Sequence, residues 1–282
     1  MTRRQALALL AAAVPARAAT PVPCLCLFSG SVQGLEYSEL PLIAKQLGFD
    51  GVDLTVRPGG HVEPRLSNVD LVRAIEEVRG PGLEAPVITT ALTTAYDPTT
   101  LPVVAIAGHT QVNLFIAGFF RAQNPGYLRD IAGLISVASR YGMATALHNY
   151  TGDDAGETSW DPVELVNGFD PKWASLFFDP IHAREKWESE LRRHLPRLRA
   201  VALKDFQMVE GVAKPCPMGQ GIVDWQKFFG ILAQAKYYGP VSLHMNYHPK
   251  DEIGSLTKDC AFAHKQINLA YKAAVPDSGG KS

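Results

Sequence analysis

Apolar runs rich in β-branched residues alternate with longer amphipathic segments along this chain, and the alternation repeats eight times. Eight strand–helix units in about 250 residues predict one α/β domain, a (β/α)₈ TIM barrel closed by parallel strands. A doubly wound open sheet is the alternative, but the glycine-rich phosphate turn that often marks such a sheet does not occur in the sequence. The predicted strands span residues 22–28, 51–56, 86–91, 110–115, 143–148, 175–179, 200–205 and 240–246.

Several predicted helices are bounded by residues that commonly begin or end helices. Apolar residues at 40, 43, 44 and 47 share one helix face, and Gly48 is expected to end that helix. A later helix is expected to start near residue 126 and to stop at Gly142, and Asp224 is the expected N-cap of another. We expect the barrel to span residues 19–275 and a flexible tail to span 276–282.

The first eighteen residues are expected to be an export signal and not part of the barrel. Arg3 and Arg4 give a charged start, residues 6–14 are apolar, and Ala16 and Ala18 occupy the positions that a signal peptidase reads. The apolar run is too short to span a bilayer, which takes about 20 residues. The arginine pair resembles a twin-arginine signal, with an ordinary secretory signal or an N-terminal helix as alternatives. We therefore expect a periplasmic or otherwise exported protein.

The charge of the chain argues against polyanionic partners. The sequence has 27 basic and 28 acidic residues, and loss of the three arginines of the predicted signal leaves a net charge of −4. This mild acidity disfavours nucleic acid and anionic membrane surfaces as partners. The sequence has no second apolar stretch of membrane length, so no membrane association is expected after signal cleavage.

The four cysteines are Cys24, Cys26, Cys216 and Cys260. An even number permits disulfides in an oxidising compartment. Cys24 and Cys26, however, lie two residues apart on one predicted strand, which is too stiff for them to pair comfortably with each other. Buried thiols are the favoured interpretation.

Polar side chains gather at the predicted ends of the strands. In a (β/α)₈ barrel these ends and the loops that follow them form the active site. Five of the eight histidines fall there, and histidine is a common metal ligand and acid–base group. The alternative is that these residues are polar caps on strand ends. The set comprises Asp53, Arg57, His61, Asn113, His148, Tyr150, Asp179, His182, Lys204, His244, Asn246 and His248.

Several of these segments resemble motifs of the xylose isomerase-like TIM barrels, the sugar phosphate isomerase and epimerase family. Residues 48–53 look like the second strand of the family, which related proteins often continue with an Arg-Pro-Gly-Gly-His loop, found here at 57–61. Residues 146–152 are similar to the fifth-strand motif, and residues 178–183 to the Asp-x-x-His of the sixth. Residues 203–206 with 216–221 resemble the seventh strand and its loop, and 242–247 match the eighth. The likeness covers nearly the whole chain after the predicted signal.

The resemblance implies a divalent metal, but most of the family's ligand positions differ in this chain. Family members hold one metal with Glu, Asp, His and Glu at the ends of strands five to eight, and the two glutamates also move the proton. Position by position, the first glutamate falls on His148, the aspartate is kept as Asp179, the histidine falls on Ala202 and the last glutamate on Asn246. With one carboxylate left, affinity for a hard ion such as Mg²⁺ should fall sharply.

Two mechanisms therefore stay open. In one, His148 and Asp179 bind Mn, Zn or Fe, with His244 or His248 as a replacement ligand. In the other no metal is bound, and an inward-facing Lys204 polarises a carbonyl or removes a proton, a role that His148 could also take. For Lys204 the structural alternative is a salt bridge to Asp179 or Asp53.

We expect an isomerase- or epimerase-like enzyme that acts on a keto- or aldo-sugar by proton transfer next to a carbonyl. A sugar-binding or non-catalytic relative is the alternative, because Ala202 and Asn246 replace a ligand and a base. A phosphodiesterase of the endonuclease IV type is disfavoured by the charge of −4 and the missing acidic ligands. The expected catalytic residues are His148, Asp179 and Lys204, and the expected substrate contacts are Asp53, Arg57, His61, His182, His244 and Asn246.

Overall fold

Eight parallel strands close into a barrel in the computed structural model, which describes residues 21–120, 126–150 and 161–274. The strand order around the barrel is β1-β10-β7-β6-β5-β4-β3-β2, and each strand pairs in parallel with the strands beside it. The predicted TIM barrel is therefore confirmed. The strands are β1 (Leu25–Phe28), β2 (Gly51–Val56), β3 (Glu84–Thr90), β4 (Leu114–Ile116), β5 (Ala144–His148), β6 (Ala174–Phe178), β7 (Leu198–Leu203) and β10 (Val241–Leu243).

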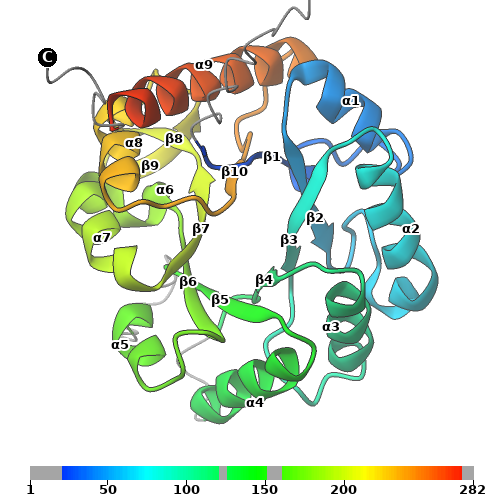
Figure 1. Cartoon of the computed structure of the whole chain (residues 1–282). Helices are drawn as coiled ribbons and strands as arrows, with labels where there is room; N and C mark the ends of the chain where they lie inside the picture. Colours follow the sequence, from blue (N-terminus) through cyan, green and yellow to red (C-terminus); the bar gives the residue numbers. More distant parts are fainter. Residues whose placement is uncertain (1–20, 121–125, 151–160, 275–282) are drawn as a thin grey trace, which may run out of the picture.

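Helices form a ring outside the barrel, as Figure 1 shows in a view along the barrel axis. The C-terminal helix α9 packs against both α8 and α1 and so completes the ring between the two ends of the chain. The helices are α1 (Leu40–Leu47), α2 (Ser67–Arg79), α3 (Thr100–His109), α4 (Tyr127–Arg140), α5 (Pro162–Asn167), α6 (Pro180–Ala183), α7 (Trp187–His194), α8 (Trp225–Gln234) and α9 (Glu252–Ala273).

Three predicted helix boundaries are found where the sequence placed them. Gly48 follows α1 with a φ of 91°, a left-handed conformation that glycine adopts without steric cost. Gly142 has a φ of 73° two residues after the last residue of α4. Asp224 caps α8, because its side chain accepts a hydrogen bond from the Lys227 N–H.

The prediction for residues 110–115 is wrong at its start, because the chain there still belongs to the end of α3. The Thr110 N–H donates to the Ile106 carbonyl, and Gln111 takes a φ of 62°. This left-handed residue reverses the chain before β4 begins at Leu114. The β-branched character of residues 110 and 112 therefore resembles strand sequence, but the hydrogen bonds close a helix.

A hairpin of β8 (Asp205–Val209) and β9 (Val212–Cys216) follows β7 and was not predicted. Glu210 and Gly211 form its two-residue turn, and both have positive φ, at 53° and 79°. This is the backbone of a type I′ turn, whose usual sequence signal is Asn-Gly or Asp-Gly. The predicted strand 200–205 consequently ends at Leu203, where Lys204 separates it from the hairpin.

Small side chains fill the inside of the barrel, and the larger apolar core lies between the strands and the helices. The interior cluster contains four alanines, two of which are Ala200 and Ala202, together with Val87, Leu114, Ile116 and Phe177. Phe177 pairs in register with His148 on the neighbouring strand, and its ring centroid lies 4.8 Å from the His148 ring and 6.1 Å from the His244 ring. This packing makes an apolar floor beneath the strand ends.

All four cysteines are free thiols. Cys26 and Cys260 are buried, while Cys24 and Cys216 are half-buried. The Sγ atoms of Cys24 and Cys26 lie 3.6 Å apart on the same side of the chain at β1. The predicted preference for thiols over disulfides agrees with this arrangement.

No helix in residues 21–120, 126–150 or 161–274 is long and apolar enough to cross a membrane. The predicted signal at 1–18 and the predicted tail at 276–282 lie outside these described residues.

The aromatic cluster around Phe228 gives a test of the outer core. Phe228 is fully buried in α8, and its ring lies 5.1 Å from Trp225, 5.9 Å from Trp187 and 6.3 Å from Phe178. Phe228→Ala should lower the free energy of unfolding by about 3–5 kcal/mol, because it removes a large buried side chain and leaves a cavity. Urea unfolding measures this change. Leu269→Ala, at a half-exposed position of α9, should stay within about 0.5 kcal/mol of the parent, and equal losses in both variants would contradict the packing described.

Candidate functional site

A cavity of about 220 Å³ lies at the carboxyl ends of the strands. It is smaller than the roughly 300–1,000 Å³ of sites that hold drug-sized ligands, so it suits a small molecule. Aromatic walls are supplied by Phe28, Phe119 and Phe177. Six of the nine predicted site residues line the cavity: Arg57, His148, His182, Lys204, His244 and Asn246.

Asp179 lies just after β6 and is fully buried beneath this cavity. It caps the short helix α6, with Oδ1 accepting a hydrogen bond from the Ile181 N–H at 3.1 Å. Its backbone is fixed by Asn149, whose amide oxygen accepts from the Asp179 N–H and whose amide nitrogen donates to the Asp179 carbonyl, both at 2.9 Å. The loops after β5 and β6 are thus tied together, and the Ile181 N–H holds one oxygen of the carboxylate.

Three basic side chains surround the second oxygen of Asp179. The Lys204 Nζ lies 2.5 Å from Oδ2, while the Nε2 atoms of His182 and His148 lie 3.7 Å and 4.0 Å away. Burial alone would raise the pKa of Asp179, but the Lys204 ammonium and the imidazoles outweigh it and hold the pKa well below its usual value. Asp179 is therefore a carboxylate at neutral pH. The salt bridge that the sequence offered as one reading of Lys204 is present.

The imidazole of His148 is oriented by the backbone that follows it. Its Nδ1 accepts a hydrogen bond from the Tyr150 N–H at 3.0 Å. Burial, reinforced by nearby His182, lowers the pKa of His148 well below its usual value, so the ring is neutral. A neutral imidazole has one protonated nitrogen, and a nitrogen that accepts a hydrogen bond is not that one. The proton is therefore on Nε2, which points toward Asp179.

Asp53 is a second buried carboxylate, on β2 at the opposite side of the barrel from Asp179. It accepts hydrogen bonds from the Ser242 hydroxyl at 2.7 Å and the Thr89 hydroxyl at 2.8 Å. Burial raises the pKa of Asp53 to about 6, although both hydroxyls and Arg57 act in the other direction. Asp53 and Asp179 thus differ in protonation behaviour because an ammonium faces one and hydroxyls face the other.

His244 lies between Asp53 and the cavity. Its ring stacks on Phe28 with centroids 3.8 Å apart and an interplanar angle of 0°. Its Nε2 is 4.0 Å from the Asp53 carboxylate. Burial lowers the pKa of His244 well below its usual value, so this ring is also neutral. Arg57 also packs on Phe28, with its guanidinium carbon 5.6 Å from the centroid of that ring.

His61 is placed differently from the other predicted residues. Its Nδ1 lies 3.3 Å from the Thr55 hydroxyl, and its backbone N–H donates to the same hydroxyl. It does not border the cavity formed by the described residues. These contacts hold the loop that carries Arg57, so His61 has a structural role in this loop. Its contact with a substrate stays a prediction.

Sequence reasoning did not single out the residues that hold Asp179, Asp53 and His244 in place. Asn149 holds Asp179, Thr89 and Ser242 hold Asp53, and Phe28 holds His244. A signal was present for Ser242, which is two residues before His244 and therefore shares its face of a strand. Nothing local distinguishes Thr89 or Phe28, since their partners are on other strands.

His148, Asp179 and His182 each offer one ligand atom, and these atoms lie within 4.8 Å of one another. A group of this kind has the composition of a transition-metal site. Of the family's other ligand positions, Ala202 is buried in the interior cluster and offers no ligand atom, and Asn246 lines the cavity with an amide.

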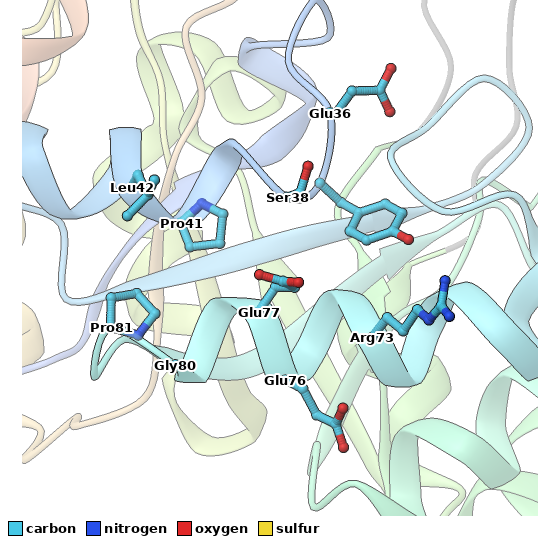
Figure 2. Close-up of a pocket in the computed structure, with 10 residues that line it drawn as sticks. Glu36, Ser38, Pro41, Leu42, Arg73, Glu76, Glu77, Gly80 and Pro81 are labelled. Atoms are coloured by element: carbon cyan, nitrogen blue, oxygen red, sulfur yellow. The ribbon is translucent and has the colours of Figure 1, made fainter.

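A second hollow, of about 600 Å³, lies outside the barrel between α1 and α2 (Figure 2). Its charged residues are Glu36, Glu76, Glu77 and Arg73, and Leu42 and Pro81 add apolar surface. None of the predicted site residues lines it. The predicted site residues that border a hollow are therefore found at the smaller one, at the strand ends.

The chain belongs to the xylose isomerase-like TIM barrel family, whose sequence model matches residues 42–265. No curated protein sequence matches the chain. The closed barrel and the family model agree on the class of protein, a xylose isomerase-like TIM barrel.

Solved structures show the same fold at low sequence identity. The xylose isomerase domain protein from Planctomyces limnophilus is 17% identical, with a TM-score of 0.69 over 90% of this chain and 99% of that one. A xylose isomerase-like TIM barrel protein from Mycobacterium smegmatis, in complex with magnesium, is 16% identical, with a TM-score of 0.63 over 90% and 98%. D-Psicose 3-epimerase from Clostridium cellulolyticum H10, with D-tagatose, is 14% identical, with a TM-score of 0.61 over 89% and 96%.

The raised pKa of Asp53 predicts a pH-dependent cost to stability. Below pH 3.8 the carboxyl is protonated in both the folded and the unfolded chain, but between 3.8 and about 6 only the unfolded chain ionises, so stability falls as the pH rises. Asp53→Asn removes this cost. The free energy of unfolding of the variant minus that of the parent should therefore increase by about 2 kcal/mol between pH 4 and pH 7. Urea unfolding across this range measures the difference, and a pH-independent difference would show that Asp53 titrates normally.

Proposed function

We propose that this protein is a sugar isomerase or epimerase that moves a proton next to a carbonyl group. One observation carries the proposal: a carboxylate, an ammonium and three imidazoles meet around a small cavity at the strand ends of a barrel of this family. Such groups can both stabilise a developing oxyanion and transfer protons. The substrate class is a free keto- or aldo-sugar small enough for the cavity, which agrees with the sugar held by the D-psicose 3-epimerase of the same fold.

Lys204 and His148 supply the hydrogen-bond donors for the substrate oxygen in this proposal. The Lys204 ammonium and the His148 Nε2–H converge on the same side of the cavity, beside Asp179. When a proton leaves the carbon next to the carbonyl, its electron pair forms a carbon–carbon double bond and negative charge moves to the carbonyl oxygen. Donors placed in advance around that oxygen stabilise the enediolate.

His244 is the group that we assign to accept the proton. It is neutral and borders the cavity, and its stacking on Phe28 fixes the ring plane. Return of the proton to the neighbouring carbon, with a proton passed from the adjacent hydroxyl to the former carbonyl oxygen, gives an isomer. Protonation of the original carbon on its opposite face gives an epimer and needs a donor on that side of the sugar, for which Lys204 and His148 are the candidates in the cavity. Proton removal by His148 or Lys204, the other assignment that the sequence allows, is distinguished from this one by the variants below.

Solvent exchange tests the proposal. Keto- and aldo-sugars are incubated with the protein in D₂O, and deuterium next to the carbonyl is measured by NMR and mass spectrometry. Lys204→Met should slow exchange by about 100-fold or more, because one oxyanion donor is lost. His244→Gln should abolish exchange while the sugar still binds. Exchange that survives in His244→Gln but disappears in His148→Gln would move the base to His148.

A sugar-binding relative without turnover is the second candidate. It is favoured by Asn246, an amide with no acid–base function, at a position where the family has a proton-transferring glutamate. In that case saturation-transfer NMR would detect a bound sugar, and no sugar in the set would incorporate deuterium.

We also propose that the chain is exported through its first eighteen residues. Arg3 and Arg4, the apolar run at 6–14 and the small residues Ala16 and Ala18 support this. Expression in a bacterial host should give a protein that begins at Ala19 and is found in the periplasmic fraction. Arg3→Lys with Arg4→Lys should keep it in the cytoplasm if the twin-arginine route is used, and N-terminal sequencing measures the outcome. An uncleaved cytoplasmic parent chain would contradict export.

A further inference from the structure

The carboxylate that a metal would need already has a cation against it. Lys204 Nζ is 2.5 Å from Asp179 Oδ2, and the two residues are 9% and 0% exposed. The other oxygen, Oδ1, accepts the Ile181 N–H within the cap of α6. Both oxygens of Asp179 are therefore engaged by donors from the protein itself.

A metal ion would compete with Lys204 for the same place. A zinc ion lies about 2.0–2.2 Å from a carboxylate oxygen that binds it. Oδ1 already accepts a backbone N–H, and an ion bound through Oδ2 would take the place that the ammonium occupies. A doubly charged ion beside an ammonium would place three positive charges against the single carboxylate of Asp179, which is unfavourable in a buried site.

The hydrogen bond at Nδ1 of His148 is one that a metal-binding histidine does not make, because this nitrogen accepts the hydrogen bond and does not donate it. A metal-binding imidazole coordinates through an unprotonated nitrogen and donates from its other N–H to an acceptor. In this protein Nδ1 of His148 faces a donor, the Tyr150 N–H, and Nε2 carries the proton toward Asp179. The Tyr150 N–H thus sets the tautomer that donates to an oxygen and not the one that binds a metal.

The remaining positions do not compensate. Ala202, where the family has its histidine ligand, is fully buried among apolar side chains. Asn246 offers one neutral oxygen in place of a carboxylate. The donor set of this chain therefore does not fit the divalent ion that the family implies, although His148, Asp179 and His182 lie close together.

We propose that the ammonium of Lys204 replaces the metal in this protein and acts as the cation that stabilises the substrate's oxyanion. The inference rests on the proposed function and deepens it by naming the electrophile. Asp179 holds the ammonium in place of a metal, and the charge of the pair sums to zero. His148 adds a neutral N–H donor on the same side. The oxyanion would therefore be stabilised by the full positive charge of Lys204 and by the N–H dipole of His148.

Metal affinity tests this without any need for turnover. The full-length protein, purified without an affinity metal and dialysed against chelator, is titrated with Zn²⁺ and with Mn²⁺ by calorimetry. The parent should bind neither ion stoichiometrically at the barrel, and neither ion should raise its thermal midpoint. Lys204→Met removes the ammonium and frees Asp179 Oδ2, so it should bind Zn²⁺ at least about 10-fold more tightly than the parent, because the repulsion between cations is gone.

Lys204→Arg is the matched control. It keeps the positive charge next to Asp179 and should stay as metal-free as the parent. If Lys204→Met is too unstable to isolate alone, refolding it with Zn²⁺ should restore a cooperative thermal transition, whereas the same ion should leave Lys204→Arg unchanged. Equal affinity of the parent and Lys204→Met for Zn²⁺, at any level, overturns the proposal, as does one equivalent of metal in the parent that is lost in Asp179→Asn.

The two proposals fail in different ways. If no sugar incorporates deuterium but Lys204→Met gains Zn²⁺ affinity, the lysine replaces the metal in a barrel that does not catalyse this reaction. If sugars exchange deuterium and the exchange needs an added metal, the enzyme assignment stands and the replacement of the metal is wrong.

Discussion

The ion pair between Lys204 and Asp179 joins the ends of two neighbouring strands beneath the mouth of the barrel. Both groups are buried, and removal of one partner from such a pair leaves an uncompensated charge, which typically costs about 3–5 kcal/mol. His148 and His182 also direct Nε2 toward the same carboxylate oxygen, at 4.0 Å and 3.7 Å. The pair therefore places an ammonium, together with N–H donors, on one side of the cavity. The other side has the neutral ring of His244 next to Asp53.

Backbone hydrogen bonds give this arrangement its precision. Asn149 fastens the loop after β5 to the loop after β6, and the next residue, Tyr150, fixes the tautomer of His148. Together with the Lys204–Asp179 pair, these contacts connect the ends of β5, β6 and β7. The opposite side is built from hydroxyls, which share hydrogen bonds with Asp53 but supply no opposite charge, and its carboxyl therefore keeps a raised pKa. A single barrel mouth thus contains one carboxyl whose pKa is held well below its usual value and one whose pKa is raised to about 6.

The sequence predicts the barrel well because its signals are local. Periodicity and glycine stops mark the strands and helices, and Asp224 and Gly48 take the roles that their positions indicate. The sequence predicts which side chains gather at the strand ends, but not which contacts they make with one another. Strand parity places Lys204, His148 and His244 at one end of the barrel. Which carboxylate pairs with the lysine depends on the register between strands, however. From the sequence alone, Asp53 and Asp179 were both possible partners of Lys204. The β8–β9 hairpin was missed because Glu-Gly forms a turn that usually carries Asn-Gly.

Changes at the family's ligand positions make sense together once the lysine is included. With alanine at position 202 and asparagine at position 246, a metal would lack two of the four ligands that the family resemblance implies. An ammonium, in contrast, needs only one carboxylate as its partner, which is Asp179 in this protein.

The most direct measurement is a crystal structure of the protein grown with Mn²⁺ and a keto-sugar, with anomalous data collected for manganese. The account predicts no anomalous peak at Asp179, Lys204 Nζ in contact with both Asp179 and the sugar carbonyl oxygen, and His148 Nε2 pointing to the same oxygen. A manganese peak bonded to Asp179, with Lys204 turned away, would contradict it.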